Sequence, residues 1–232
     1  MGAQWKQKHK VAAADSKGRL FGKLTKEIVV AARGGADPAM NAALRMALEA
    51  ARKQSVPRET VERAVKKGAG LADGAAQFEQ VTYEGFAPHN VPVVVECLTD
   101  NKNRTASSMR VLFRGGQQGA SGSVTWDFSR VGMIEASPPE AGEDPEEAAI
   151  EAGAGDVQVE EEGSCSFITD ASALHAVSNA LGERGWTAES ACLVWMPNNP
   201  LTLGEAERDE VEAWLDKMDA DDDVQKIFVG LA

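Results

Sequence analysis

The hydrophobic pattern of this chain changes its period once, at a stretch of small residues from Gly68 to Ala76. Before that stretch apolar residues recur at helical spacing. After it, short β-branched runs typical of strands alternate with helical segments. The stretch itself has the composition of a linker. The sequence therefore predicts a helical N-terminal part, residues 1–74, followed by mixed α and β structure.

The first helix is predicted between Asp15 and Gly34. Projected at about 100° per residue, its apolar side chains fall on one side and four cations fall on the other. The apolar stripe comprises Leu20, Phe21, Leu24, Ile28, Ala31 and Ala32, and the basic stripe comprises Arg19, Lys23, Lys26 and Arg33. We expect the apolar stripe to face a core and the basic stripe to lie opposite it.

Two further helices complete the predicted bundle. Gly34-Gly35 ends the first helix, and Asp37-Pro38 begins the second as its cap and first-turn proline. The second helix runs to Lys53. A third opens at Pro57 and stops at Gly68, with cations near its C-terminus, where they interact favourably with the helix dipole.

The rest of the chain predicts an α+β arrangement. Strands are expected at 91–98 and 123–128, with a helix at 105–113 between them. Between two proline-rich breaks, segments follow in the order strand, helix, strand, strand, helix, strand, which is the ferredoxin-like βαββαβ arrangement. Their ranges are 131–136, 146–152, 156–160, 164–169, 171–184 and 187–196.

A last helix at 203–218 and a last strand at 224–229 are too short to fold alone, so we expect them to pack on the 78–130 segment. The predicted fold is therefore α+β and multidomain. It has a basic helical bundle, 1–74, and a middle domain, 78–130 plus 201–232. A ferredoxin-like domain, 131–200, is inserted in the middle one.

Charge is distributed unevenly along the chain. Residues 1–70 contain 15 Lys and Arg against 6 Asp and Glu, a net charge of +9. The remaining 162 residues carry 9 basic and 30 acidic groups, a net charge of −21. Because the Debye length at physiological salt is about 8 Å, a partner at the N-terminal third meets mainly positive charge. A polyanion-binding surface and a solvated surface without a partner both fit this pattern.

The sequence shows no motif of a membrane span, a secretory signal, a disulfide framework or a zinc site. No apolar run approaches the roughly 20 residues of a membrane-spanning helix, and the basic N-terminus is not followed by the apolar stretch of a secretory signal. Three widely spaced cysteines, Cys97, Cys165 and Cys192, fit neither a disulfide framework nor a zinc site. We therefore expect a cytoplasmic protein that is not an enzyme, with no metal, no cofactor and no evident small-molecule substrate.

Two loops deserve comparison as binding sites. The strand at 91–98 ends in a polar run, 99–105, at a position where loops commonly bind ligands. There Lys102 and Arg104 are placed to reach a phosphate, although a structural turn with a helix cap also fits the run. The glycine-rich run 115–122 precedes a predicted strand, so a turned loop is favoured over a phosphate cradle. An enzyme site built from both loops is the least favoured interpretation, and it predicts activity lost on Asp100→Ala.

Several runs in the chain resemble the YebC family of bacterial regulatory proteins, which includes the PmpR regulators and the mitochondrial translational activator of cytochrome c oxidase subunit I. The most specific run is Leu-Thr-Asp-Asn-Lys-Asn-Arg-Thr at 98–105. The others are Phe21-Gly22-Lys23-Leu24, Gly35-Ala36-Asp37-Pro38, Arg63-Ala64-Val65-Lys66-Lys67-Gly68, Tyr83-Glu84-Gly85-Phe86, Val194-Trp195-Met196-Pro197 and Asp222-Asp223-Val224-Gln225.

The resemblance covers nearly the whole chain and implies a three-domain α/β protein with a helical bundle and an inserted ferredoxin-like domain. Family members are described as DNA-binding transcriptional regulators. The mitochondrial branch and some bacterial members are associated with ribosomes and translation. The chain departs from the family at Ala87-Pro88-His89-Asn90, where a Gly-Pro-Gly-Gly loop is usual.

We therefore predict a nucleic-acid-binding regulatory protein, with a DNA-binding transcriptional regulator as the first hypothesis. A translation factor docked on ribosomal RNA is the alternative. The predicted contact residues are Lys8, Lys10, Arg19, Lys23, Lys26, Arg33, Arg63, Lys66, Lys67, Lys102 and Arg104. If six to eight of them touched duplex phosphates, log K would fall with log salt at a slope of roughly −5 to −7. Reversing the charges of Lys23 and Lys26 is expected to weaken binding without unfolding the bundle.

Overall fold

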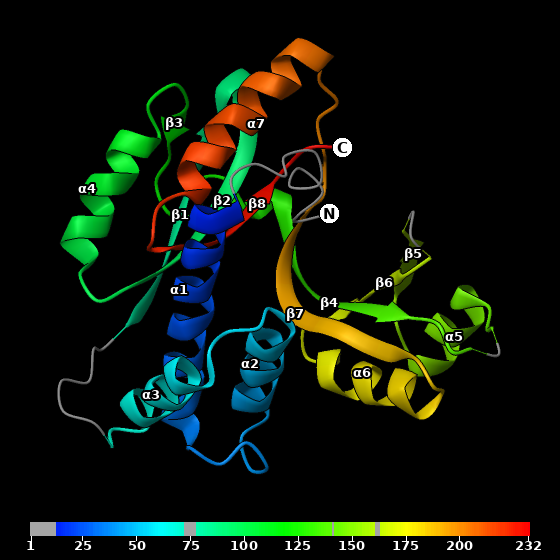
Figure 1. Ribbon diagram of the computed structural model, residues 1–232. Coiled ribbons are helices and arrows are strands. Elements are labelled where there is room, and N and C mark those ends of the chain that lie inside the picture. The colour runs from blue at the N-terminus through cyan, green and yellow to red at the C-terminus, as the bar shows by residue number, and fades with distance from the viewer. Residues whose placement is uncertain (1–12, 72–77, 141, 161–162) are drawn as a thin grey trace. The chain divides into compact units, whose positions relative to one another are not determined.

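The computed structural model describes residues 13–71, 78–140, 142–160 and 163–232 (Figure 1). The chain divides into two compact units. The first, here called the inserted unit, is Trp126–Asn199. The second, the main unit, consists of the described residues up to Thr125 together with Pro200–Ala232. Each unit is built around its own antiparallel four-stranded sheet. The α+β class is confirmed.

The predicted helical bundle is present in the main unit. Its elements are α1 (Ala13–Ala31), a 3-10 turn η2 (Ala32–Gly34), α2 (Ala42–Lys53) and α3 (Arg58–Gly68). Ile28 of α1, Leu44 and Ala51 of α2 and Ala64 of α3 are buried in one cluster. These positions lie on the apolar sides of their helices, as the helical periodicity indicates.

The second helix begins later than predicted. Asp37 and Pro38 form a turn, and α2 starts after Asn41. The Asn41 side chain accepts a hydrogen bond from Leu44 N at 3.1 Å and donates to the carbonyls of Ala31 and Gly35 at 2.8 and 2.9 Å. Asn41 therefore caps α2 and also satisfies carbonyls at the end of α1, which the Asp37 carboxylate, an acceptor only, does not do.

The glycine that ends α3 has a packing role. A Cβ added at Gly68 would lie 2.2 Å from the Val29 carbonyl oxygen and 2.7 Å from the Ala32 Cβ. Only glycine allows the end of α3 to approach the backbone of α1 this closely.

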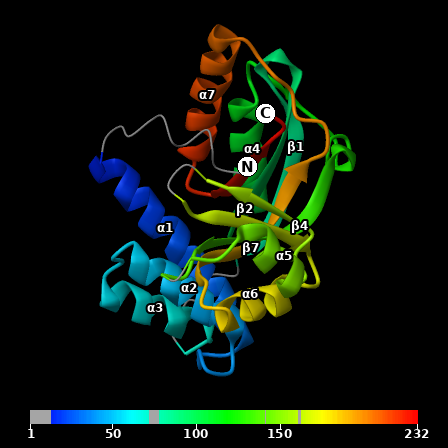
Figure 2. The ribbon, with the colours of Figure 1, turned by 90° about the vertical axis from the view of Figure 1, so that its right-hand side faces the viewer.

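The sheet of the main unit has the order β3-β1-β2-β8. Helices α4 and α7 share one buried cluster with its central strands (Figures 1 and 2). The strands are β1 (Glu79–Ala87), β2 (Val91–Thr99), β3 (Gln117–Gln118) and β8 (Val224–Val229), and the helices are α4 (Lys102–Leu112) and α7 (Glu205–Asp219). The predictions at 91–98, 105–113, 203–218 and 224–229 are confirmed, with α4 starting earlier. Neither β1 nor β3 was predicted.

One strand prediction is wrong. Residues 123–128 do not form a strand, because Thr125–Asp127 is a 3-10 turn and β4 begins only at Phe128. The buried carboxylate of Glu84 accepts hydrogen bonds from the backbone N–H groups of Gly122, Val124 and Thr125. These donors point at one side chain rather than at a neighbouring strand, so the segment turns.

The turn between β1 and β2 has two consecutive residues in the left-handed region. His89 and Asn90 have φ values of +61° and +59°, in the left-handed region that glycine adopts without strain. Asn is among the residues that tolerate this region best.

The inserted unit confirms the ferredoxin-like arrangement. Its sheet has the order β5-β6-β4-β7, antiparallel throughout, and two helices pack on one face over Phe167 and Ile134. The strands are β4 (Phe128–Ser137), β5 (Asp156–Val159), β6 (Cys165–Asp170) and β7 (Thr187–Pro197), and the helices are α5 (Pro145–Ala152) and α6 (Leu174–Glu183). The division of the main unit into a separate bundle and middle domain stays a prediction. Among the residues described, no helix is both long and apolar enough to cross a bilayer.

A cation–carboxylate network beside the candidate nucleic-acid interface

Two cations of α1 form ion pairs with carboxylates at the end of α7 and in the turn before β8. This segment, Asp219–Asp223, is here called the acidic turn. The Lys23 ammonium lies 2.8 Å from the Asp219 carboxylate and donates to the Asp219 carbonyl at 3.0 Å. One turn further along, the Lys26 ammonium donates to Asp223 Oδ1 at 2.9 Å and to the carbonyls of Asp222 and Leu98 at 2.6 and 3.3 Å. An ammonium has three donors, so these contacts use the full capacity of Lys26.

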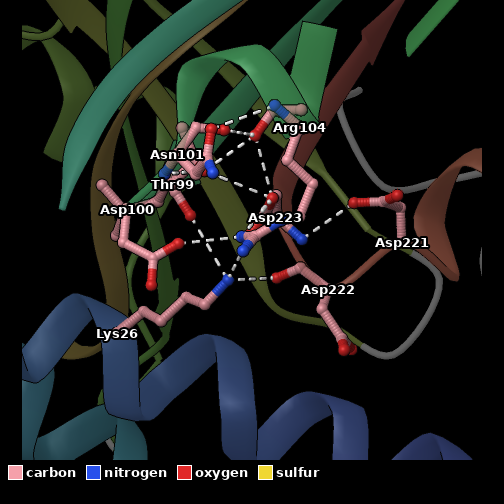
Figure 3. A network of polar contacts seen from close by, with 10 residues as sticks. Lys26, Thr99, Asp100, Asn101, Arg104, Asp221, Asp222 and Asp223 are labelled. Atoms are coloured by element: carbon pink, nitrogen blue, oxygen red, sulfur yellow. Dashed lines mark hydrogen bonds and ion pairs between the residues drawn. The ribbon is translucent and has the colours of Figure 1, made fainter. Parts of the chain in front are cut away.

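Asp223 is the centre of this network (Figure 3). Its side chain is 8% exposed and receives Arg104 Nη2 from α4 at 3.0 Å in addition to Lys26. The hydroxyl groups of Thr105 and Thr99 donate to Oδ2, the oxygen that also accepts from Arg104, at 2.9 and 3.3 Å, and Lys26 donates to Oδ1. One carboxylate thus joins the first helix, the end of β2, the start of α4 and the last turn of the chain.

The environment keeps Asp223 ionised. Burial alone would raise the pKa of this carboxyl group, but hydrogen bonds from Lys26, Arg104 and Thr105 outweigh burial and hold its pKa below the ordinary value. A buried charge is tolerated when it is paired and hydrogen-bonded in this way. The network therefore attaches α1 to the sheet of the main unit.

The polar run 99–105 serves this attachment. Asn101 caps α4 by accepting from Arg104 N at 3.1 Å. Arg104 also pairs with Asp100 at 2.9 Å, and Lys102 pairs with Glu79 of β1. Both cations predicted to reach a phosphate thus meet carboxylates of the same unit.

One cation of α3 and one of α1 lie over an aromatic ring, that of Phe78. The ammonium of Lys67 lies 5.8 Å from the centroid of Phe78, and that of Lys26 lies 5.6 Å from the same centroid. A hollow of about 300 Å³ opens between α1 and α3 at this ring, and Arg63 lines it. Arg63 donates to the Glu59 carbonyl and the Thr60 hydroxyl of its own helix.

Four predicted contact residues are exposed in the described part of the bundle and make no ion pair among the described residues. They are Arg19, Arg33, Arg63 and Lys66. Arg19 lines a groove of about 880 Å³ bounded by α1, the start of α4 and the turn at Asp221–Asp223. Lys8 and Lys10 lie outside the described residues.

The predicted basic stripe therefore separates into two groups. Lys23 and Lys26 are half-buried against the acidic turn. The expectation that the whole basic stripe faces away from packed surfaces is therefore wrong for these two residues. Arg19 and Arg33, at the two ends of the stripe, remain exposed. The reason is that α1 packs on two sides, with its apolar side in the bundle and part of its basic side on the turn after α7.

The glycine-rich run 115–122 does not offer a free anion site at its final amides. The N–H groups of Gly122, Val124 and Thr125 already bind the Glu84 carboxylate at 2.8 to 3.0 Å. Burial alone would raise the pKa of Glu84, but these backbone donors hold it below the ordinary value. Among the described side chains, no group of three or more His, Cys, Asp or Glu residues is arranged to hold a metal ion.

Sequence reasoning missed the acidic half of the network. Asp219, Asp223 and Glu84 were not singled out as partners of the cations or of the glycine loop. The available signal was the run Asp221-Asp222-Asp223 directly before the last strand, a concentration of charge at a point where the chain returns to the sheet. Its partner on α1 lies 197 residues earlier in the sequence, and Arg104 lies 119 residues earlier.

Fold and site together define a multidomain α+β protein with a basic helical bundle, a ferredoxin-like insertion and a buried junction of cations and carboxylates. The family described as the TACO1/YebC protein N-terminal domain matches residues 2–71, and the TACO1/YebC second and third domain matches residues 78–231. The chain belongs to the TACO1/YebC family.

Relatives match over the full length. Proteins named probable transcriptional regulatory protein from Polaromonas sp. (strain JS666) and Pseudomonas fluorescens (strain Pf0-1) are 61% and 59% identical, with 100% of each chain covered. One from Bdellovibrio bacteriovorus is 49% identical over 98% of both chains. The crystal structure of a conserved hypothetical protein from Aquifex aeolicus matches with a TM-score of 0.84 and 40% identity, covering 97% of this chain and 93% of that one.

Proposed function

We propose that this protein is a nucleic-acid-binding regulator of gene expression whose partner is duplex DNA. The observation that carries the proposal is the set of exposed cations on the bundle, Arg19, Arg33, Arg63 and Lys66, in a chain whose remainder is strongly acidic. The relatives named as transcriptional regulators support a regulatory role. The acidic remainder would repel a polyanion and so confine contact to the bundle.

The exposed cations set the length of the contact. Arg19 and Arg33 lie fourteen residues apart along α1 and η2, which corresponds to about 20 Å at 1.5 Å per residue. Arg63, Lys66 and Lys67 add contacts from α3, which packs against α1. Such cations bind phosphates and carry no sequence information by themselves. Affinity is therefore expected to come mainly from the nucleic-acid backbone.

The structure sharpens the expected salt dependence. Lys23, Lys26, Lys102 and Arg104 are paired with carboxylates, which leaves five described cations of the predicted set. Five phosphate contacts correspond to a slope of log K against log salt of about −4 to −5 on duplex DNA. Binding that does not respond to salt would contradict the proposal.

Variants on α3 test which cations make the contacts. Lys66→Gln and Arg63→Gln are each expected to weaken binding and to reduce the salt slope by about 1. Arg58→Gln is the matched control, because it removes the same charge from an exposed position on the same helix but from a side chain already paired with Glu62 at 2.7 Å. An equal effect of all three changes would show that only net charge matters.

Competition with ribosomes separates DNA from ribosomal RNA, because the same cations would contact RNA phosphates. The protein is mixed with purified ribosomes and sedimented with and without an excess of duplex DNA. Release into the supernatant on adding DNA supports the DNA proposal. Retention on ribosomes in the presence of the duplex contradicts it and supports the alternative, a translation factor on ribosomal RNA.

A further inference from the structure

The two ion pairs between α1 and the acidic turn differ in how exposed their carboxylates are. Asp223 is 8% exposed and receives donors from four side chains. Asp219 is 28% exposed, and Lys23, one of its partners, reaches it from α1 and also donates to its carbonyl. Asp219 is also the last residue of α7. A carboxylate at that position is disfavoured by the negative end of the helix dipole, which makes the Asp219 pair the weaker of the two.

The groove beside this pair has cations of α1 on one side and the carboxylates of Asp221, Asp222 and Asp223 on the other, so a phosphate is placed on the α1 side. Gly18 and Gly22 of α1 line it, and a Cβ at either position would meet nothing within 4 Å. Arg19 lines the same groove and lies one helical turn before Lys23. Side chains four residues apart on a helix have Cβ atoms about 5–6 Å apart. A phosphate held by Arg19 therefore comes within reach of the Lys23 ammonium.

We propose that Asp219 is an internal competitor of the nucleic acid for Lys23. In the protein alone the Asp219 carboxylate is paired with the Lys23 ammonium. A phosphate that enters the groove at Arg19 takes the place of this carboxylate. The Asp223 network stays closed during this exchange and keeps α1 attached to the sheet. This inference rests on the proposed function, because the competing anion is a nucleic-acid phosphate.

Charge-neutral substitutions on α7 test the competition. Asp219→Asn removes the competing charge, and Asp216→Asn is its control, an exposed carboxylate one turn earlier on the same helix. Both variants change net charge equally. With a short duplex DNA, Asp219→Asn is expected to bind about twofold to fivefold tighter than Asp216→Asn at low salt, the worth of a modestly exposed ion pair. Its salt slope should match that of Asp216→Asn, because Lys23 contacts the phosphate in both variants and Asp219 changes only the free energy of reaching that contact.

A double variant tests whether Lys23 is the residue for which Asp219 and the phosphate compete. Lys23→Gln alone should lose one contact, and Lys23→Gln/Asp219→Asn should bind no tighter than Lys23→Gln. Equal affinity of Asp219→Asn and Asp216→Asn would overturn the inference, as would weaker binding by Asp219→Asn with an unchanged circular dichroism melt. Absence of any binding by the unaltered protein would overturn the proposed function and this inference together.

Discussion

Replacing Asp223 by alanine removes the one side chain that Lys26, Arg104, Thr99 and Thr105 share. The variant leaves the Thr99 and Thr105 hydroxyl groups, 1% and 0% exposed as residues, with each other at 2.7 Å and with the backbone of Asn101 as hydrogen-bond partners. Removing one partner of a buried pair costs about 3–5 kcal/mol. The Arg104 side chain is 54% exposed and Lys26 keeps two carbonyl acceptors, so the lower end of that range, about 3 kcal/mol, is expected.

This cost is measurable in the main unit. For a chain of this size about 3 kcal/mol corresponds to a fall in Tm of roughly 6–12 °C. Calorimetry of the whole protein, with hydrogen exchange on α1 as a local readout, separates the main unit from the inserted one. Asp222→Ala is the control, because the exposed Asp222 gives Lys26 only its backbone carbonyl, and its effect should stay within about 0.5 kcal/mol. A loss below about 1 kcal/mol in Asp223→Ala would refute the role assigned to the carboxylate.

Four other predictions follow from buried groups. Gly68→Ala should destabilise the bundle by about 1–3 kcal/mol in urea unfolding, despite alanine's higher helix propensity, because its Cβ would overlap the α1 backbone; an unchanged midpoint would contradict this packing. Glu84→Gln should cost about 1–3 kcal/mol in the same assay, because the carboxamide turns a donor toward backbone donors; equal stability would show that the loop does not need the charge. The pKa values of Asp223 and Glu84 are lowered in the folded state, so their contribution is present above their unfolded values near 4 and is lost as pH falls below them; a Tm that stays constant from pH 5 to pH 3 would exclude it. Burial raises the pKa of the Cys97 thiol to about 12, so iodoacetamide at pH 8 should modify Cys97 only after unfolding, as peptide mass spectrometry would show.

The helices and most strands could be predicted from the sequence because their own residues determine them. The stripe through Leu24 and Ile28 gives α1 its helical period, and the continuous apolar run from Val91 to Leu98 gives β2 its place in the middle of a sheet. The order of segments between Phe128 and Pro197 was enough to predict the ferredoxin-like unit. In each case the pattern and the packing surface lie in the same short segment.

The errors arise where a distant side chain decides the local backbone. Val124, Trp126 and Phe128 alternate as in a strand, but Glu84, about forty residues earlier, binds the amides of that segment. Strand β1 was missed because its outward residues are polar and Gly85 interrupts its alternation. The start of α2 was misplaced because Asn41 satisfies carbonyls of the preceding helix as well as its own cap.

The surroundings of the charged residues on α1 could not be predicted from the sequence for the same reason. A helical projection places Lys23 and Lys26 opposite the apolar stripe, and that geometry is equally consistent with solvent and with a second packing surface made of carboxylates. The acidic turn after α7 supplies that surface. Reversing both charges would therefore place two new carboxylates against Asp219 and Asp223 and would detach α1 as well as weaken binding. Loss of nucleic-acid binding in such a variant identifies an interface only when Arg63→Gln or Lys66→Gln, which leave the network intact, weakens binding too.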